Sequence, residues 1–245
     1  MSVQTVGCPA KELITSLVWA KAMTDTTSHI TLLRSTSLFA GLSDEAIETI
    51  AAASDDRKLR RGDKLFTEGD TPDRLYVVTS GRIAIANRSI DGRESVVALM
   101  EPGDLFGEMG LFDGPGRSAD ARALETSGVL EVPYAPVKAL YEESPSELWG
   151  VVRLLAGRLR SMDEALADSV FLDVTGRTAK RLLELAGDSD EFTLPITQEE
   201  LAGMVGASRE RVNKAIASFV RLGWIAQNDR RYTITNREQL SIRSR

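Results

Sequence analysis

The sequence predicts an α+β fold in three parts: an N-terminal β-barrel of the jelly-roll (double-stranded β-helix) type, a long helix, and a C-terminal winged helix-turn-helix. Between residues 58 and 132, short apolar runs of strand length alternate with glycine-containing turns, which is typical of a small sandwich or barrel. Residues 144–172 carry apolar side chains at helical spacing. Residues 196–235 show two short capped helices followed by a hairpin pattern.

The composition is that of a folded protein without a metal centre. Of the 245 residues, 42% are hydrophobic and 27% are charged. One cysteine, Cys8, and one histidine, His29, exclude an internal disulfide and any multi-cysteine or multi-histidine metal site, so a jelly-roll metalloenzyme is rejected. No apolar run reaches the roughly 18 residues of a membrane span, and no secretory leader is present. We expect a cytoplasmic protein with no membrane partner, no metal and no enzymatic activity.

Four segments follow from the changes in pattern. We expect an N-terminal extension over 1–28, poorly ordered or forming a short helix, with Met1 and Met23 as alternative starts. The first domain then covers 29–143, the long helix and a hinge cover 144–172, and the second domain covers 173–245. Lys and Arg outnumber Asp and Glu in the last segment, whereas the whole chain has a net charge of −6. This asymmetry favours a polyanion as the partner of the C-terminal domain.

Two local signals mark the first domain. Ser43, followed by two acidic residues and an apolar stripe, predicts a helix N-cap. Asp91-Gly92 predicts a hairpin turn, because both residues tolerate positive φ.

Residues 106–119, which we call the cassette, combine glycines with three polar side chains. Glycine lets the backbone approach a ligand closely, and the Glu108 carboxylate can accept a hydrogen bond from a ribose hydroxyl. The Arg117 guanidinium can bind a phosphate through two parallel hydrogen bonds, and Ser118 adds a hydroxyl donor. This pattern predicts a sugar-phosphate site. The alternative is a salt bridge within the loop between Glu108 and Arg117.

Residues 196–214 carry the signals of a helix-turn-helix. Thr197 and Glu200 form a capping box, Gly206 provides the turn, and Ser208 caps the second helix. Polar and basic residues cluster at the start of that helix, where a recognition helix meets base edges. The predicted DNA-contacting residues are Thr197, Ser208, Arg209, Glu210, Arg211, Asn213 and Lys214.

A predicted wing over 224–235 adds Arg230 and Arg231 at its tip, which suits phosphate contact. The alternatives are a surface helical hairpin with solvated charges and a solvated hairpin tip.

The long helix repeats apolar residues every three or four positions, which is the heptad spacing of a coiled coil. Burial against the chain's own barrel and a parallel dimer interface are both consistent with this spacing, on different faces of the helix. The candidate dimer residues are Leu148, Val152, Leu155, Leu159, Met162 and Leu166.

Taken together and in this order, these segments resemble the catabolite activator (CRP/FNR) family of transcription regulators, and in particular its actinobacterial cyclic-AMP receptor proteins. The resemblance covers roughly residues 30–245. The cassette is similar to the phosphate-binding segment of cyclic-nucleotide-binding domains, and residues 171–177 resemble the family's hinge. Ser208-Arg209-Glu210 resembles its base-reading tripeptide.

The resemblance implies roles for several residues. Glu108 would bind the ribose 2′-hydroxyl, Arg117 and Ser118 the cyclic phosphate, and the backbone near Gly107 and Met109 would donate to the ligand. Arg158 matches a position that reaches the phosphate and the cassette glutamate. The implied effector is cyclic AMP.

The sequence departs from the family in the long helix and the recognition helix. Relatives that bind cyclic AMP carry Thr with Ser or Asn where this chain has Met162 and Asp163. Asp163 can accept from the adenine amino group or from the paired donors of guanine, so cyclic GMP stays a candidate; a solvated Asp163 with a weak response is a third reading. Lys214 stands where many relatives have arginine, and Arg211 where a smaller residue is usual.

The main hypothesis is therefore a homodimeric transcription regulator, an activator or a repressor, that binds a cyclic nucleotide and a pseudo-palindromic site on double-stranded DNA. RNA polymerase is a further candidate partner. One alternative keeps DNA binding but makes it independent of, or weakly modulated by, cyclic AMP. Another is a nucleotide-binding module of an enzyme, which would leave residues 197–214 without a task.

Overall fold

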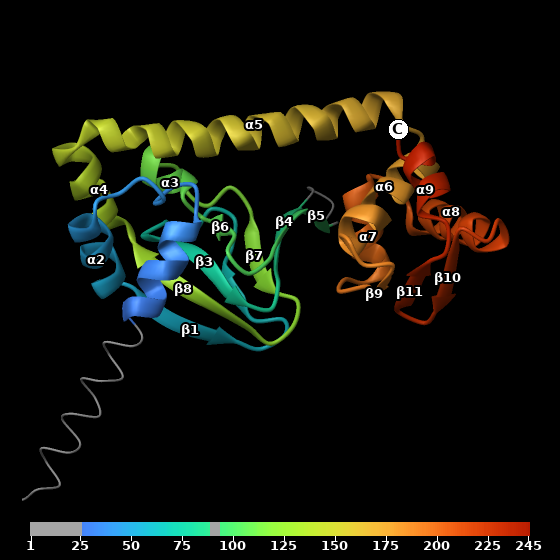
Figure 1. Cartoon of the computed structure of the whole chain (residues 1–245), viewed down its shortest axis with the longest axis horizontal. Coiled ribbons are helices and arrows are strands. Elements are labelled where there is room, and N and C mark those ends of the chain that lie inside the picture. The colour runs from blue at the N-terminus through green and yellow to red at the C-terminus, as the bar shows by residue number, and fades with distance from the viewer. Residues whose placement is uncertain (1–25, 89–93) are drawn as a thin grey trace, which may run out of the picture.

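The computed structural model describes residues 26–88 and 94–245 as two domains joined by one long helix (Figure 1). Most of the expected extension over 1–28 and the Asp91-Gly92 turn lie outside the described residues. A helix covers residues 26–35, and α2 (Asp44–Ala52) begins at the predicted N-cap, Ser43, whose side chain accepts from the Ala46 N–H.

The N-terminal domain packs two four-stranded antiparallel sheets against each other. One has the order β1-β8-β3-β6 and the other β2-β7-β4-β5, and a core of side chains from both sheets lies between them. The described strands form hydrogen bonds within each sheet and not between the two sheets. The predicted barrel is therefore a jelly roll of two packed sheets. The strands are β1 (Asp55–Leu59), β2 (Lys64–Phe66), β3 (Arg74–Ser80), β4 (Ile83–Arg88), β5 (Glu94–Met100), β6 (Leu105–Phe106), β7 (Asp120–Ala123) and β8 (Ser127–Pro133).

The turn between β3 and β4 requires glycine. Gly81 has φ +71°, and a Cβ there would lie 2.4 Å from the Ser127 Oγ and 2.6 Å from the Thr126 carbonyl oxygen. This turn is one of the glycine-containing turns predicted between residues 58 and 132, and its glycine has a steric cause.

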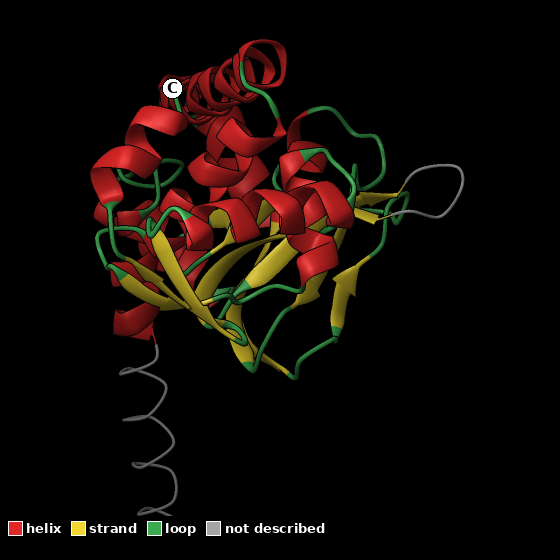
Figure 2. Ribbon diagram, turned by 90° about the vertical axis from the view of Figure 1, so that its right-hand side faces the viewer, coloured by secondary structure: helices red, strands yellow, loops and turns green. Residues whose placement is uncertain are grey.

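Helices cover one face of the first sheet (Figure 2). The helix over 26–35, α2, α4 (Tyr134–Glu143) and the start of α5 (Leu148–Phe171) share a second core with strands β3 and β8. A 3₁₀ turn (Pro145–Glu147) leads into α5. Only Gly150 and Val151 of α5 are buried, and a Cβ at Gly150 would lie 2.8 Å from the Leu38 carbonyl oxygen. The helix is thus fixed to the N-terminal domain mainly near its beginning.

The C-terminal domain has the predicted helix-turn-helix with its wing. Its described elements are α6 (Val174–Ala186), β9 (Glu191–Thr193), α7 (Gln198–Val205), α8 (Arg209–Arg221), β10 (Ile225–Asn228), β11 (Arg231–Ile234) and α9 (Arg237–Arg243). The capping box of Thr197 and Glu200, the left-handed Gly206 and the Ser208 cap are all confirmed. The sequence predicted a hairpin only, whereas β9 adds a third strand beside β11.

The two domains touch where α7 packs against β5 (Figure 1). The Ser95 hydroxyl donates to the Gly203 carbonyl at 3.1 Å, and a Cβ at Gly203 would lie 3.2 Å from the Ser95 Cα. Arg122 of β7 pairs with Glu94 at 2.7 Å and also with Glu200 of α7. One continuous apolar core includes buried residues of both domains.

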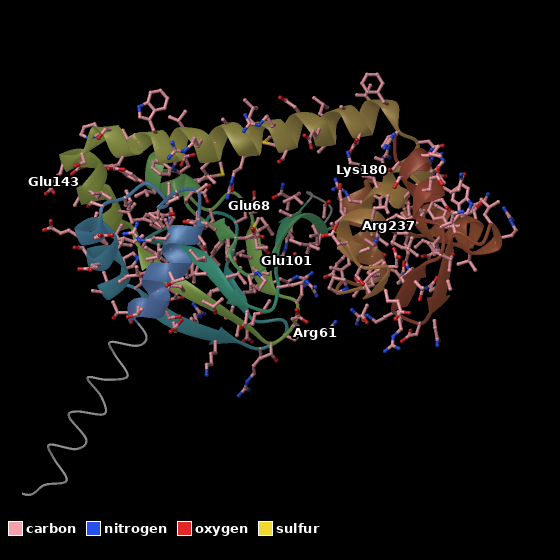
Figure 3. All side chains as sticks on the ribbon, in the orientation of Figure 1. Arg61, Glu68, Glu101, Glu143, Lys180 and Arg237 are labelled. Atoms are coloured by element: carbon pink, nitrogen blue, oxygen red, sulfur yellow. The ribbon has the colours of Figure 1, made fainter. Side chains whose placement is uncertain are left out.

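A second contact joins α5 to the C-terminal domain. Lys180 of α6 pairs with Asp168 of α5 at 2.5 Å, and Figure 3 shows the labelled Lys180 beside the last turns of α5. The position of the helix-turn-helix relative to the N-terminal domain is therefore held from two sides.

Replacing Arg122 by alanine is expected to loosen the domain contact, because it leaves the carboxylates of Glu94 and Glu200 facing each other without a cation. A loss of about 1 kcal/mol at this partly exposed pair would raise the open population roughly fivefold. Limited proteolysis at the connection over 171–173 measures that population. Arg82→Ala is the matched control, since Arg82 also pairs with two carboxylates, both within the N-terminal domain; equal cleavage rates in the two variants would contradict the interpretation.

Candidate nucleotide-binding and DNA-binding sites

The cassette lies between β6 and β7 and contains the short helix α3 (Met109–Phe112). Gly107 has φ +76°, and a Cβ there would lie 2.8 Å from the Arg117 Nη1. Only a glycine at position 107 therefore lets the Arg117 side chain approach the backbone this closely.

Glu108 is fully buried, and its partner is Arg158 of α5. The Arg158 Nη1 lies 2.8 Å from Oε1, and Nη2 donates to Oε2 at 3.1 Å and to the Leu105 carbonyl at 3.0 Å. The alternative interpretation, a salt bridge between Glu108 and Arg117, is wrong, because both guanidinium hydrogen bonds that Arg117 makes to the backbone lead elsewhere. The position that the family resemblance assigned to Arg158, against the cassette glutamate, is the one observed.

The buried carboxylate keeps capacity to accept a further hydrogen bond. Oε1 of Glu108 is in ionic contact with Arg158 but has no hydrogen-bond donor within the described part of the chain. Burial raises the pKa of Glu108 above its ordinary value, while the charge of Arg158 limits that rise. A ligand hydroxyl could therefore donate a hydrogen bond to Oε1, in addition to its ionic contact with Arg158.

Arg117 is buried and held by the protein. Its Nη1 donates to the Gly107 carbonyl at 2.7 Å and to the Tyr134 hydroxyl at 3.3 Å, and its Nη2 donates to the Arg74 carbonyl at 2.7 Å. The guanidinium carbon lies 4.2 Å from the centroid of the Phe66 ring, a cation–π contact. Of five N–H groups, Nε–H and one Nη2–H have no acceptor among the described residues, and a phosphate can take these two donors.

The other predicted nucleotide residues divide into two groups. Met109 and Ser118 lie at the exposed rim of the cassette, with the Ser118 hydroxyl 3.8 Å from the Met109 sulfur. Met162 and Asp163 are exposed on α5 and do not join this site. At about 100° per residue, Asp163 points roughly 140° away from Arg158 around the helix.

Sequence reasoning missed the residues that hold Arg117. Tyr134 and Tyr76 lie beside its guanidinium, and the Arg74 carbonyl accepts from it. Phe66 belongs to a run that resembles the family's first domain, but nothing in its sequence position indicates an arginine contact. Only the folding of β2, β3 and α4 around residue 117 brings these groups together.

The recognition helix α8 presents its polar residues to solvent. The apolar side of the helix is buried, whereas Arg209, Glu210, Arg211, Asn213 and Lys214 are exposed, and none of them forms an ion pair within the described ranges. Cations in the first turns of a helix oppose its dipole, so helix stability does not explain this cluster.

The two wing arginines lie at the tip of the hairpin, as predicted, but their side chains differ. Arg231 is exposed, as expected. Arg230 instead donates to the Leu194 carbonyl at 2.8 Å and to the Ile196 carbonyl at 3.4 Å. Its guanidinium thereby supports the segment that leads into α7, and Arg231 is the wing arginine that can reach a phosphate.

The apolar stripe of α5 is not covered by the chain's own domains. The six candidate dimer residues are between 38% and 68% exposed, and Figure 3 shows side chains of α5 projecting from its outer side into solvent. Burial of these six against the barrel is therefore the wrong interpretation, although Val151 on another face of the helix is buried. No helix among the residues that the structure describes has the length and apolar character needed to cross a membrane.

Comparison with known proteins agrees with this arrangement. Residues 56–144 match the cyclic nucleotide-binding domain, and residues 176–242 match the Crp-like helix-turn-helix domain. The chain is 36% identical over 221 residues to the CRP-like cAMP-activated global transcriptional regulator of Mycobacterium tuberculosis, across 87% of this chain and 99% of that protein. The chain belongs to the CRP family of transcription regulators.

Solved structures support the same fold for this CRP-family chain. The c-di-GMP-responsive global regulator CLP of Xanthomonas campestris is 26% identical, with a TM-score of 0.67 over 78% of this chain and 99% of that one. FixK2 from Bradyrhizobium japonicum has a TM-score of 0.71 at 21% identity, over 78% of this chain and 98% of that one, and supports the fold alone. The predicted family and fold class are confirmed.

The pair of Glu108 and Arg158 predicts a pH-dependent stability. A carboxyl whose pKa is raised by folding stabilises the folded state below its unfolded pKa, and this contribution is lost as the pH rises through the folded pKa. Arg158→Leu removes the charge that limits the rise, so the loss of unfolding free energy between about pH 4 and neutral pH is expected to be larger than in the wild type.

Urea unfolding at a series of pH values measures this difference. Arg158→Lys keeps a cation and is expected to restore much of the wild-type profile. Identical pH profiles for Arg158→Leu and the wild type would contradict the assigned pair.

Proposed function

We propose that this chain is a cyclic-nucleotide-responsive regulator that binds double-stranded DNA as a homodimer. Residues 29–143 would bind the nucleotide, 144–172 would dimerise, and 173–245 would bind DNA. The observation that carries this proposal is the presence, in one chain, of a buried Arg117 with unbonded N–H donors and of an exposed basic cluster at the start of α8.

The cassette supports a nucleotide with a cyclic phosphate. The two free donors of Arg117 and the hydroxyl of Ser118 would bind the phosphate, and Oε1 of Glu108, which has no hydrogen-bond donor in the described residues, would accept from the ribose 2′-hydroxyl. Backbone groups near Gly107 and Met109 would complete the contact. The relative from M. tuberculosis is named as cAMP-activated, and we propose cyclic AMP as the first effector to test.

Arg158 would link the ligand to the dimer helix. Its guanidinium binds both Glu108 and the Leu105 carbonyl, so a ligand that touches Glu108 also acts on α5. Nucleotide can change DNA affinity only if it binds one arrangement of the dimer more tightly than another.

The exposed stripe on α5 supports a second copy as its partner. Two parallel helices would bury the six apolar residues and place two recognition helices for half-sites about one turn of DNA apart. A pseudo-palindromic operator follows from that symmetry. RNA polymerase is the further partner that a DNA-bound activator of this family would contact.

A second candidate function keeps DNA binding but makes it independent of nucleotide. The exposed Met162 and Asp163 favour it, because Met162 offers no useful hydrogen bond to a base. Guanine, with two adjacent donors, would suit the Asp163 carboxylate better than adenine, so cyclic GMP is the second effector to test.

Titration calorimetry with cyclic AMP and cyclic GMP tests the nucleotide site. The wild type is expected to bind at least one of them, and Arg117→Ala to lose about tenfold to a hundredfold in affinity, since a charged hydrogen-bonding group contributes about 1.5–3 kcal/mol. Arg57→Ala is the control, because Arg57 pairs with Glu131 on the first sheet and not with the cassette. No heat with either nucleotide would overturn the sensing part, and an unchanged gel shift at saturating nucleotide would support the nucleotide-independent alternative.

Arg209→Ala tests the DNA site. A base contact predicts a loss of about 1–3 kcal/mol on a specific operator and little on random DNA, measured by fluorescence anisotropy at fixed salt. Arg221→Ala, at the exposed opposite end of the same helix, is expected to bind like the wild type. Equal losses on both DNAs would instead make Arg209 a phosphate contact.

A further inference from the structure

Tyr134 lies at a junction of three segments around Arg117. It is the first residue of α4, directly after β8, and its backbone N–H donates to the Asp73 carbonyl at 2.9 Å. The next residue along that strand, Arg74, supplies the carbonyl that accepts from the Arg117 Nη2. The backbone of Tyr134 is thus fixed to the strand end that also holds Arg117.

The hydroxyl of Tyr134 makes two contacts at the other side of the guanidinium. It donates to the Gly107 carbonyl and accepts from the Arg117 Nη1 at 3.3 Å. Burial of the ring raises the pKa of Tyr134 to about 12, so the hydroxyl keeps its proton and can donate to a carbonyl. A single oxygen therefore connects the cassette backbone to the phosphate-binding side chain.

Counting donors shows what this oxygen does to Arg117. Nη1 donates to the Gly107 carbonyl and to the Tyr134 hydroxyl, two oxygens that are hydrogen-bonded to each other and lie on the same side of Nη1, and one hydrogen of Nη2 is taken by the Arg74 carbonyl. Because the guanidinium is planar, these three bonds fix its plane and direct the remaining Nε–H and Nη2–H to one side. Without the hydroxyl, Nη1 would lose one of its two acceptors and the Gly107 carbonyl would lose a donor that holds it, so the guanidinium would be held less firmly on this side.

The same hydroxyl fixes the peptide that precedes Glu108. Its bond to the Gly107 carbonyl holds that carbonyl toward Arg117, and in a trans peptide the Glu108 N–H then points the opposite way. The starting orientation of Glu108 and of α3 is therefore set by the same contact.

We propose that Tyr134 is a positioning residue of the nucleotide site, which orients the free donor edge of Arg117 and the peptide between Gly107 and Glu108. The inference rests on the proposed function for what binds, but the orientation of Arg117 exists without ligand. Tyr134 would touch neither base nor ribose, so its effect belongs to the phosphate end of the ligand.

Tyr134→Phe keeps the ring and removes the oxygen. We expect its affinity for cyclic AMP and for cyclic GMP to fall by the same factor, about threefold to tenfold, as for the loss of one hydrogen bond. Thermal unfolding should shift little, since the ring and the backbone bond to Asp73 stay. A loss that differs between the two bases, or unchanged affinity for a nucleotide that the wild type binds, would overturn the proposal.

Tyr141→Phe is the matched control. Tyr141 lies on the same helix, is buried, and has a hydroxyl without a hydrogen-bond partner in the described residues. Removing that oxygen should leave nucleotide affinity unchanged. An equal loss in Tyr141→Phe and Tyr134→Phe would assign both effects to packing of α4 and would also overturn the proposal.

Nitrogen-15 NMR of the arginine side chains in the nucleotide-free protein gives an independent test. Rotation about the Cζ–Nη1 bond of Arg117 should be slower in the wild type than in Tyr134→Phe, because Nη1 has two acceptors in the wild type and only the Gly107 carbonyl in the variant. Arg117→Lys assigns the resonance by its disappearance. If the wild type bound no nucleotide, the proposed function would fail while this measurement still decided the orienting role; equal rotation rates in wild type and Tyr134→Phe would exclude it.

Discussion

The ion pair between Glu108 and Arg158 is the interaction on which the arrangement of the first domain and the long helix depends. A carboxylate with no exposure to water is destabilising unless a cation and hydrogen bonds compensate it. The compensating cation comes from α5, which otherwise touches the N-terminal domain mainly near its start. The helix is consequently fixed at a second point, ten residues further along, and that point is the candidate ribose contact. The position of α5 and the binding of a ligand in the cassette would therefore be linked, because both involve the carboxylate of Glu108.

A second link runs through strand β7. Arg117 and Ser118 directly precede this strand, and Arg122 within it binds Glu200 of α7. Glu200 is also the capping residue of α7, because its carboxylate accepts from the Thr197 N–H at 2.6 Å. A shift of Arg117 toward an anion would thus act on a strand that contacts α7, the first helix of the helix-turn-helix. The N-terminal domain is thus connected to the recognition helix α8 in two ways, through α5 with the hinge and through β7 with α7.

Local rules predicted the parts of the fold that local chemistry decides. Ser43, Thr197, Gly206 and Ser208 cap or end helices through atoms three or four residues away, and each was predicted from sequence. Contacts between segments far apart in the sequence could not be predicted from these local rules. Strand β9 forms because β11 follows some forty residues later, and Arg230 binds carbonyls of residues 194 and 196 instead of projecting from the wing. The cassette was recognisable, but the tyrosine that orients its arginine was not.

In the proposed nucleotide site, the base end would differ from the phosphate end, because one subunit does not supply residues for it. Glu108, Arg117 and Arg158 are brought together within a single subunit, whereas Asp163 points away from them on a helix whose apolar stripe is also open. In the proposed parallel dimer, residues that flank this stripe lie against the second helix and near the second copy's cassette. The carboxylate of Asp163 would then reach a base only across the interface. Selectivity between adenine and guanine would arise from dimer geometry, and affinity for the phosphate from residues of a single subunit.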